Sequence, residues 1–225
     1  MSVFDEAALK NEYHSCEKQD YLDDLKKIVI ESKVPLEGNS FYIHQSLNLY
    51  PDLYTKQLNL FWCGKQATRI CEIGFNAGHS VLLMLLGRDK TPIDFTIFDI
   101  GEHVYTRPCF EYMKSKFQHV RFEFIEGDST VTIPQWIEAR TPELYDVIHV
   151  DGGHSEHCIT NDMKNADRLV KMNGIVIIDD TNCDYINKCV DLYLSTGNYI
   201  ELNVLKTKGY PHRIIKCINR CISSS

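Results

Sequence analysis

Three aspartates follow two apolar segments of the chain, at positions where side chains commonly bind ligands. Asp151 follows the segment VIHV, and the pair Asp179–Asp180 follows the segment IVII. Apolar runs of this kind are typical of buried parallel strands, and neighbouring strands of an open α/β sheet deliver their carboxyl ends to one crevice. Three carboxylates gathered there would repel one another, and a divalent cation would remove that repulsion.

Asp151, Asp179 and Asp180 are therefore predicted to hold a metal ion. Oxygen ligands without cysteine or paired histidine favour Mg²⁺, Mn²⁺ or Ca²⁺ over zinc, and Mg²⁺ is our first choice. The alternative interpretation is that these carboxylates are structural, as strand-end and helix-capping residues.

One histidine lies close to these carboxylates in the sequence. His154 is three residues after Asp151, and the two residues between them are glycines. A neutral imidazole near pH 7 can accept the proton of a hydroxyl group, so we predict a catalytic role for His154 as general base beside Asp151. His157 is the rival on the same reasoning, and a lone histidine is often a structural surface residue.

A second stretch, residues 68–80, reads TRICEIGFNAGHS. Its first six residues predict a buried strand, and Ser80 with the leucine-rich run after it predicts the start of a helix. Strand, glycine turn and helix together aim backbone N–H groups at a ligand. The dinucleotide pattern G-x-G-x-x-G is not present; instead Glu72 lies two residues before Gly74, where a carboxylate can accept from a cationic amino group.

This stretch resembles motif I of the class I S-adenosylmethionine-dependent methyltransferases, E/D-x-G-x-G-x-G, with Asn76 in place of the middle glycine. Asparagine is among the few residues other than glycine that tolerate a positive φ, so the turn can survive the change. Within that superfamily the chain most resembles the small-molecule and sugar O-methyltransferases, over about residues 60–220. The further matches, in order, are Asp99, Gly127-Asp128-Ser129, Asp151-Gly-Gly-His154, Asn173-Gly174 and Asp179-Asp180.

The resemblance implies that S-adenosylmethionine is bound at these matching positions. The implied cofactor-binding residues are Glu72, Gly74, Asn76, Gly78, His79, Ser80, Asp99, Asp128, Ser129 and Asp151. A carboxylate at Asp99 can accept from both ribose hydroxyls, and the family places the residue matching Asp128 near the adenine. The structural alternatives are a turn residue at Asp99 and a helix N-cap at Asp128 or Ser129.

The elements that position these residues alternate between strand and helix, which predicts a parallel sheet. We predict an α/β, Rossmann-like, seven-stranded, mostly parallel sheet with helices on both faces and an N-terminal helical section. The chain is expected to be one methyltransferase domain, 1–225, with a helical cover over 1–64 and the Rossmann-like core over 65–220. The expected strands are 68–73, 93–98, 120–125, 145–150, 174–179, 199–206 and 212–218, and the expected helices of the core are 79–87, 106–117, 130–140, 156–171 and 184–195.

Composition narrows the partners and the compartment. The formal net charge is −7 and the isoelectric point is near 5.7, which disfavours nucleic acid as a partner. Nine scattered cysteines without a C-x-x-C pair suit reduced thiols in a cytoplasmic protein. We find no signal peptide and no apolar run long enough to span a membrane. The oligomeric state is open, a homo-oligomer included.

The sequence therefore predicts an S-adenosylmethionine-dependent O-methyltransferase, assisted by a divalent metal ion, that methylates a hydroxyl of a small molecule or sugar. Two alternatives stay open. One is a metal-independent class I methyltransferase with structural carboxylates. The other is a catalytically degenerate protein that binds the cofactor only, an interpretation that the substitution at Asn76 supports.

Overall fold

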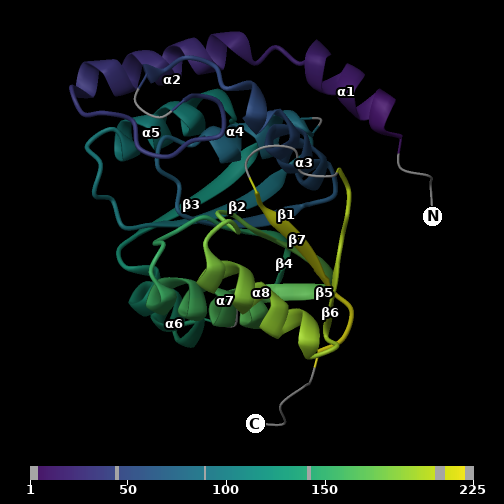
Figure 1. Ribbon diagram of the computed structural model, residues 1–225. Helices are drawn as coiled ribbons and strands as arrows, with labels where there is room; N and C mark the ends of the chain where they lie inside the picture. Colours follow the sequence, from purple (N-terminus) through teal and green to yellow (C-terminus); the bar gives the residue numbers. More distant parts are fainter. Residues whose placement is uncertain (1–4, 44–45, 89, 141–142, 206–210, 221–225) are drawn as a thin grey trace.

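A seven-stranded sheet forms the centre of the molecule in the computed structural model, which describes residues 5–43, 46–88, 90–140, 143–205 and 211–220 (Figure 1). Its strand order is β3-β2-β1-β4-β5-β7-β6. The first five strands are parallel, and β7 runs antiparallel to both β5 and β6. The strands are β1 Arg69–Ile73, β2 Ile93–Asp99, β3 Val120–Glu126, β4 Tyr145–Val150, β5 Val170–Ile178, β6 Tyr199–Glu201 and β7 Arg213–Cys217.

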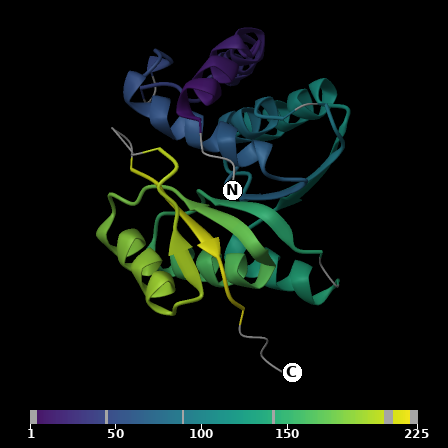
Figure 2. The same ribbon diagram turned by 90° about the vertical axis from the view of Figure 1, so that its right-hand side faces the viewer.

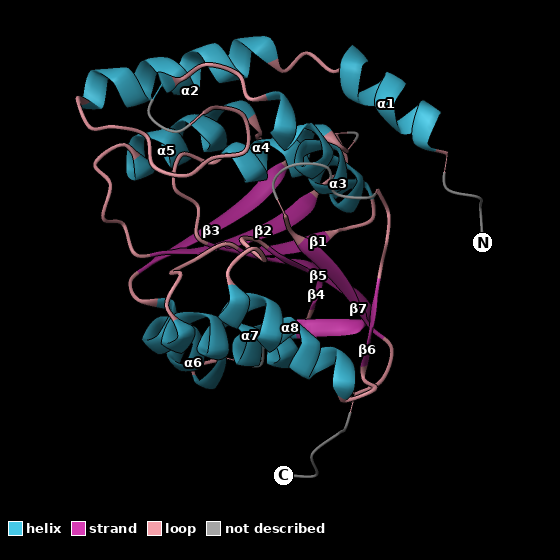
Figure 3. Ribbon diagram, viewed as in Figure 1, coloured by secondary structure: helices cyan, strands magenta, loops and turns pink. Residues whose placement is uncertain are grey.

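Helices cover both faces of this sheet (Figures 2 and 3). The helices α3, α4 and α5 lie on one face with α1 and α2 beyond them, and α6, α7 and α8 lie on the other. Their bounds are α1 Glu6–Ser15, α2 Gln19–Ser32, α3 Tyr54–Lys65, α4 His79–Leu86, α5 Thr106–Lys116, α6 Ser129–Glu138, α7 Glu156–Leu169 and α8 Asp184–Ser195, with a short 3₁₀ helix, η2 Pro51–Leu53, before α3. The predicted fold class is therefore confirmed. Within the described residues, no helix has both the length and the apolar character needed to cross a bilayer.

Two strands depart from the predicted bounds. Strand β5 begins at Val170 rather than near residue 174, because the pairing of β4 with β5 shifts register between Tyr145 and Val147. Asn173 has a φ of 66° and lies inside this irregular part of β5, whereas the sequence predicted that the strand would begin just after it, at residue 174. Strand β6 is three residues long rather than eight, and most of the predicted turn over 208–211 lies outside the described residues.

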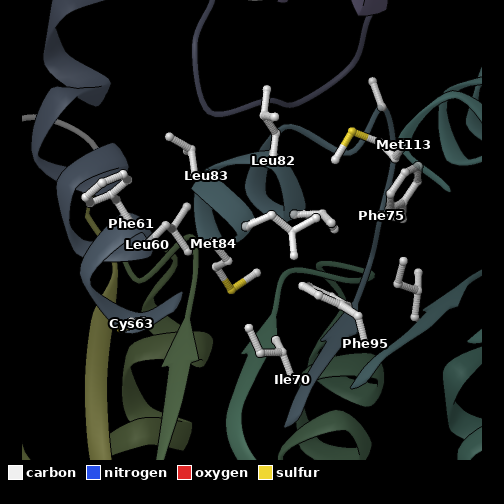
Figure 4. Close-up of a cluster of buried hydrophobic side chains, with 14 of the residues drawn as sticks. Leu60, Phe61, Cys63, Ile70, Phe75, Leu82, Leu83, Met84, Phe95 and Met113 are labelled. Atoms are coloured by element: carbon white, nitrogen blue, oxygen red, sulfur yellow. The ribbon is translucent and has the colours of Figure 1, made fainter. Parts of the chain in front are cut away.

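Strand β1 contributes side chains to the hydrophobic cores on both faces of the sheet, and the cleft begins at its carboxyl end. Because neighbouring strand residues face opposite sides, Ile70 packs into the cluster under α3, α4 and α5, and Cys71 and Ile73 pack into the cluster under α6, α7 and α8. Figure 4 shows the first cluster, in which Ile70 and Phe95 from the strands lie opposite Leu82 and Met84 from α4. All of these side chains are fully buried, and their packing holds the end of β1, at Ile73, in place.

The helices α3 and α4 pack unusually closely, and a glycine makes this possible. A Cβ placed on Gly64 would lie 1.9 Å from the backbone oxygen of Met84. Neither backbone can yield without moving its whole helix, so Gly64 fixes the position of α3 over the sheet. This position determines where the earlier residues of α3 reach.

We expect Gly64→Ala to destabilise the fold strongly, because the added methyl group meets backbone rather than a flexible side chain. The loss in the free energy of unfolding should be about 3 kcal/mol, the upper end for overpacking. Gly197→Ala is the matched control: Gly197 has a φ of 73° but open space around it, so only the strain of a left-handed alanine, about 1 kcal/mol, applies. Urea unfolding of both variants measures the difference, and equal losses would contradict the close-packing argument.

Candidate active site

A cleft of about 520 Å³ opens at the carboxyl ends of the parallel strands. This is the edge where open α/β sheets bind ligands. Of the residues predicted from the sequence, the cleft is lined by Gly74, Asn76, His79, Ser80, Asp99, Asp128, Ser129, Asp151, His154, Asp179 and Asp180. Glu72 and Gly78 do not line it. The strand ends thus bring most of the predicted residues to one place, and their roles there stay predictions.

The glycine turn after β1 runs directly against the end of β4. Gly74 has a φ of 92°, and a Cβ there would lie 2.0 Å from the backbone oxygen of Asp151. Asn76 has a φ of 51°, in the left-handed region, so an asparagine does occupy the position that is glycine in the family pattern. The turn therefore accommodates asparagine at this position, as we expected from the sequence.

Asp99 holds this turn in shape from the end of β2. Its Oδ2 accepts hydrogen bonds from the backbone N–H groups of Phe75 at 2.7 Å and Asn76 at 2.9 Å. Its Oδ1 accepts from the N–H of Gly101 at 2.7 Å. The carboxylate is therefore a turn residue, which was the structural alternative, and it also lines the cleft. Glu102 also lines the cleft.

The side chain of Asn76 connects the turn to the N-terminal section. Its Nδ2 donates to the backbone oxygens of Glu37 and of Gly38, the latter at 3.0 Å. Residues 37–40 in consequence lie over the turn and line the cleft. A glycine at position 76 could adopt the same φ but could not make these bonds.

Glu72 lies behind the turn rather than in the cleft. Its side chain is fully buried, and its Oε1 accepts from the Ser80 hydroxyl and contacts Nδ1 of His149 at 2.8 Å. Burial alone would lower the pKa of His149, but the bond to Glu72 and the charge of Asp151 raise it. A direct contact between Glu72 and a cofactor amino group stays a prediction, and in this structure the carboxylate is bound to protein groups.

Asp128 and Ser129 combine a structural contact with a place in the cleft. Asp128 is the N-cap of α6, where its Oδ1 accepts from the N–H of Thr130 at 2.9 Å. The hydroxyl of Ser129 donates to Oδ1 of Asp162 at 2.7 Å. The capping alternative is therefore present at Asp128, and it leaves the side chain at the cleft wall.

A lysine from the N-terminal section reaches the aspartates at the ends of β4 and β5. Nζ of Lys56, on α3, forms an ion pair with Oδ2 of Asp179 and lies 3.7 Å from Oδ2 of Asp151. The side chains of Lys56 and Asp179 are each 4% exposed. Burial alone would lower the pKa of Lys56, but the two carboxylates raise it, so the amine is charged at neutral pH.

The neighbouring carboxylates differ in their pKa because their partners differ. Burial would raise the pKa of Asp179, but contact with Lys56 lowers it. Burial and the charge of Asp179 raise the pKa of Asp151, which lies farther from the ammonium. Of the two, Asp179 is the permanent anion that balances Lys56.

His154 is paired with Asp180 at the outer end of the cleft. Its Nε2 lies 2.7 Å from Oδ2 of Asp180, and this hydrogen bond raises the pKa of the imidazole. If Nε2 carries the proton that this bond needs, Nδ1 is left as the basic nitrogen. His157, the rival base, does not line the cleft and instead contacts Asn161 on α7.

The three aspartates predicted as metal ligands fall into two groups. Asp151, His154 and Asp180 have ligand atoms within 4.8 Å of one another, as do His149, Asp151 and Asp179. Within the part of the chain that the structure describes, the three aspartates do not form one such group by themselves. Oδ2 of Asp179 is bound to Lys56, and the joint binding of one ion by Asp151, Asp179 and Asp180 stays a prediction.

Sequence reasoning did not identify Lys56 or residues 37–40 as part of the site. Lys56 shares a helical face with Leu60 and Cys63, at spacings of four and seven residues, and both of these are fully buried. A lysine in an otherwise apolar stripe was therefore a usable signal. Residues 37–40 carry no comparable signal, because their place depends on long-range bonds to Asn76.

Comparisons with known proteins agree with this fold. Residues 71–181 match the family model described as a methyltransferase domain. An O-methyltransferase from Bacillus cereus, solved in complex with SAH, is 17% identical over 95% of this chain and 97% of that chain, with a TM-score of 0.63. An apo TDP-rhamnose 3′-O-methyltransferase of calicheamicin biosynthesis is 14% identical over 89% and 94%, with a TM-score of 0.63.

An N-methyltransferase, NodS from Bradyrhizobium japonicum, solved in complex with S-adenosyl-L-homocysteine (SAH), is 12% identical over 85% of this chain and 99% of that chain, with a TM-score of 0.57. A search of curated proteins gives no significant match. The predicted Rossmann-like fold is confirmed, and the match to a methyltransferase domain covers 71–181, from strand β1 to just beyond strand β5.

We expect Asp99→Ala to weaken two properties at once. Loss of three backbone hydrogen bonds should lower the stability of the cofactor-free protein, and loss of the turn's shape should weaken cofactor binding by about 1.5–3 kcal/mol, the range for hydrogen bonds to a charged group. Glu102→Ala is the control for stability, because Glu102 lines the cleft without these bonds to the turn. Thermal unfolding and calorimetry with S-adenosylmethionine measure both effects; an unchanged melting temperature for Asp99→Ala would contradict its role in the turn.

Proposed function

We propose that this protein is an S-adenosylmethionine-dependent O-methyltransferase that acts on a hydroxyl of a small molecule, with sugars among the candidates. The observation that carries the proposal is the cleft itself. It joins a glycine turn at a helix N-terminus to a histidine–carboxylate pair, His154 and Asp180. Two of the similar structures named above, an O-methyltransferase and a TDP-rhamnose 3′-O-methyltransferase, support the same proposal.

The cofactor is proposed to lie along the turn between β1 and α4. Gly74 allows the turn to lie directly against the backbone of Asp151 at the end of β4, and the N-terminus of α4, at His79, presents unpaired N–H groups. Asp99 or Glu102 would accept from the ribose, and Asp128 and Ser129 would border the adenine. S-adenosylmethionine supplies a methyl group on a positively charged sulfur.

The acceptor hydroxyl is proposed to lie between the turn and the ends of β4 and β5. Nδ1 of His154 accepts the hydroxyl proton, while Asp180 holds the imidazole by its other nitrogen. The acceptor oxygen forms a bond to the methyl carbon as the bond from that carbon to sulfur breaks, and the electron pair stays on sulfur. Most of the protein's contribution is orientation of the two reactants.

A divalent cation remains the finer prediction of the sequence. If one binds, Asp151, His154 and Asp180 are the group that would hold it, and it would lower the pKa of a coordinated hydroxyl. Asp179 belongs to the other group, with His149 and Asp151, and its Oδ2 is already paired with Lys56. The transfer proposed above does not depend on this ion, because His154 alone can accept the proton.

The function is tested by binding and turnover with the full chain. We expect S-adenosylmethionine and its demethylated product to bind at micromolar concentration, about −8 kcal/mol, and labelled methyl groups to appear on hydroxylated small molecules rather than on amines or nucleic acid. Calorimetry and mass spectrometry of the products measure both. If millimolar cofactor gives neither heat nor thermal stabilisation, the proposal is wrong.

His154→Ala should lose about 10²–10⁴-fold in kcat, the usual worth of a positioned base. Cofactor affinity should change little, because His154 pairs with Asp180 and makes no bond to the glycine turn. His157→Ala is the matched control, since His157 lies three residues further along and does not line the cleft. Steady-state kinetics with the acceptor found above decides the matter, and a loss in His157→Ala instead would transfer the role of base to His157.

A further inference from the structure

Lys56 is a buried charge that the function proposed so far does not use. It comes from α3, in the N-terminal section, and its buried side chain reaches the aspartates at the ends of β4 and β5. It also lines the cleft, although the residue is only 3% exposed. Its polar neighbours on α3 do not line the cleft. Gln57 bonds to Tyr13 and Ser40, and Asn59 bonds to His212.

A lysine is buried in this way only if its charge is compensated. An uncompensated ammonium strongly disfavours burial, and the ion pair with Asp179 supplies the compensation. The second carboxylate, Asp151, is 3.7 Å away. Lys56 therefore lies within the group of aspartates from which the sequence analysis inferred a metal ion.

We propose that Lys56 is the resident cation of the acceptor site, and that methyl transfer proceeds with its ammonium in place of a divalent metal ion. This inference rests on the proposed function and deepens it. As the hydroxyl proton moves to His154, negative charge develops on the acceptor oxygen, and the ammonium at the cleft wall stabilises that charge. Lys56 keeps its own protons throughout, and Asp179 keeps the ammonium in place.

The same contacts disfavour a metal ion in the wild-type protein. The group that could hold one includes Asp151, whose Oδ2 is 3.7 Å from the Lys56 ammonium. A divalent ion on that carboxylate would be repelled by a buried positive charge, in surroundings where charges are weakly screened. Removal of the lysine charge should therefore improve metal binding at the remaining carboxylates.

The first experiment needs no turnover. Mn²⁺ is titrated into the wild type, Lys56→Met and Lys65→Met, and free Mn²⁺ is followed by electron paramagnetic resonance. Lys65 is the matched control, because it lies on the same helix and pairs with Glu12 away from the cleft. We expect at least a tenfold gain in Mn²⁺ affinity for Lys56→Met only. Equally tight binding by the wild type would overturn the inference, whether or not the proposed function holds.

The second experiment measures turnover with the acceptor identified for the wild type. After chelation and buffer exchange, the wild type should retain its full rate, and Lys56→Met should lose about 10²–10³-fold in kcat, the usual cost of removing a charge-stabilising donor, with cofactor affinity unchanged. Loss of wild-type activity on chelation, restored by Mg²⁺, would overturn the inference.

A double variant separates catalysis from structure. Lys56→Met leaves Asp179 buried without its partner and can unfold the protein, whereas Lys56→Met with Asp179→Asn removes both charges. We expect the double variant to fold, to bind the cofactor and to remain slow, and Lys56→Arg to recover part of the rate. A double variant with the wild-type rate would make Lys56 only the structural partner of Asp179, and the inference would be wrong.

Discussion

The requirement that a buried charge be paired determines the arrangement of the acceptor end of the cleft. Lys56 and Asp179 are 123 residues apart in the chain and nearly inaccessible to solvent, and each is the ion-pair partner of the other. Removal of one partner of such a pair typically costs about 3–5 kcal/mol, because the other is left uncompensated. Helix α3 and the end of β5 must therefore stay together. The close contact of Gly64 with α4 keeps α3 at the distance from the sheet that this ion pair needs.

The N-terminal section is bound to the cleft at a second place, so it is part of the site and not only a cover over the sheet. Asn76 bonds to the backbone of residues 37 and 38, and Gln57 on α3 bonds to Ser40 at 2.7 Å. A section expected as a helical cover thus provides one wall of the cleft and the cation in it. The division at residue 64 stays a prediction about the domain, but the site is built from both sides of it. Asn76, which suggested degeneration, has a bonding role that glycine lacks.

The strands and core helices were predictable because their signals are local. Apolar runs such as VIHV and IVII locate β4 and β5, and the glycine turn locates the start of α4. The misplaced start of β5 and the short β6 depend on pairing between strands, which a single sequence does not contain. Asp99 shows the same limit for a side chain. Its place at a strand end was readable, but its three backbone partners follow from the shape of the turn.

The prediction of a metal ion considered only the charges of the carboxylates at the strand ends. Asp151, Asp179 and Asp180 are all acidic, and a cation was inferred because three carboxylates gathered at neighbouring strand ends would repel one another. A cleft, however, collects charges from every element that lines it, and the opposing charge comes from a helix about a hundred residues earlier. The ammonium of Lys56 answers part of the charge-crowding argument, because it pairs with Asp179, and the divalent ion stays a prediction. The buried stripe of α3, in which a lysine takes the place of an apolar residue, was not part of that argument.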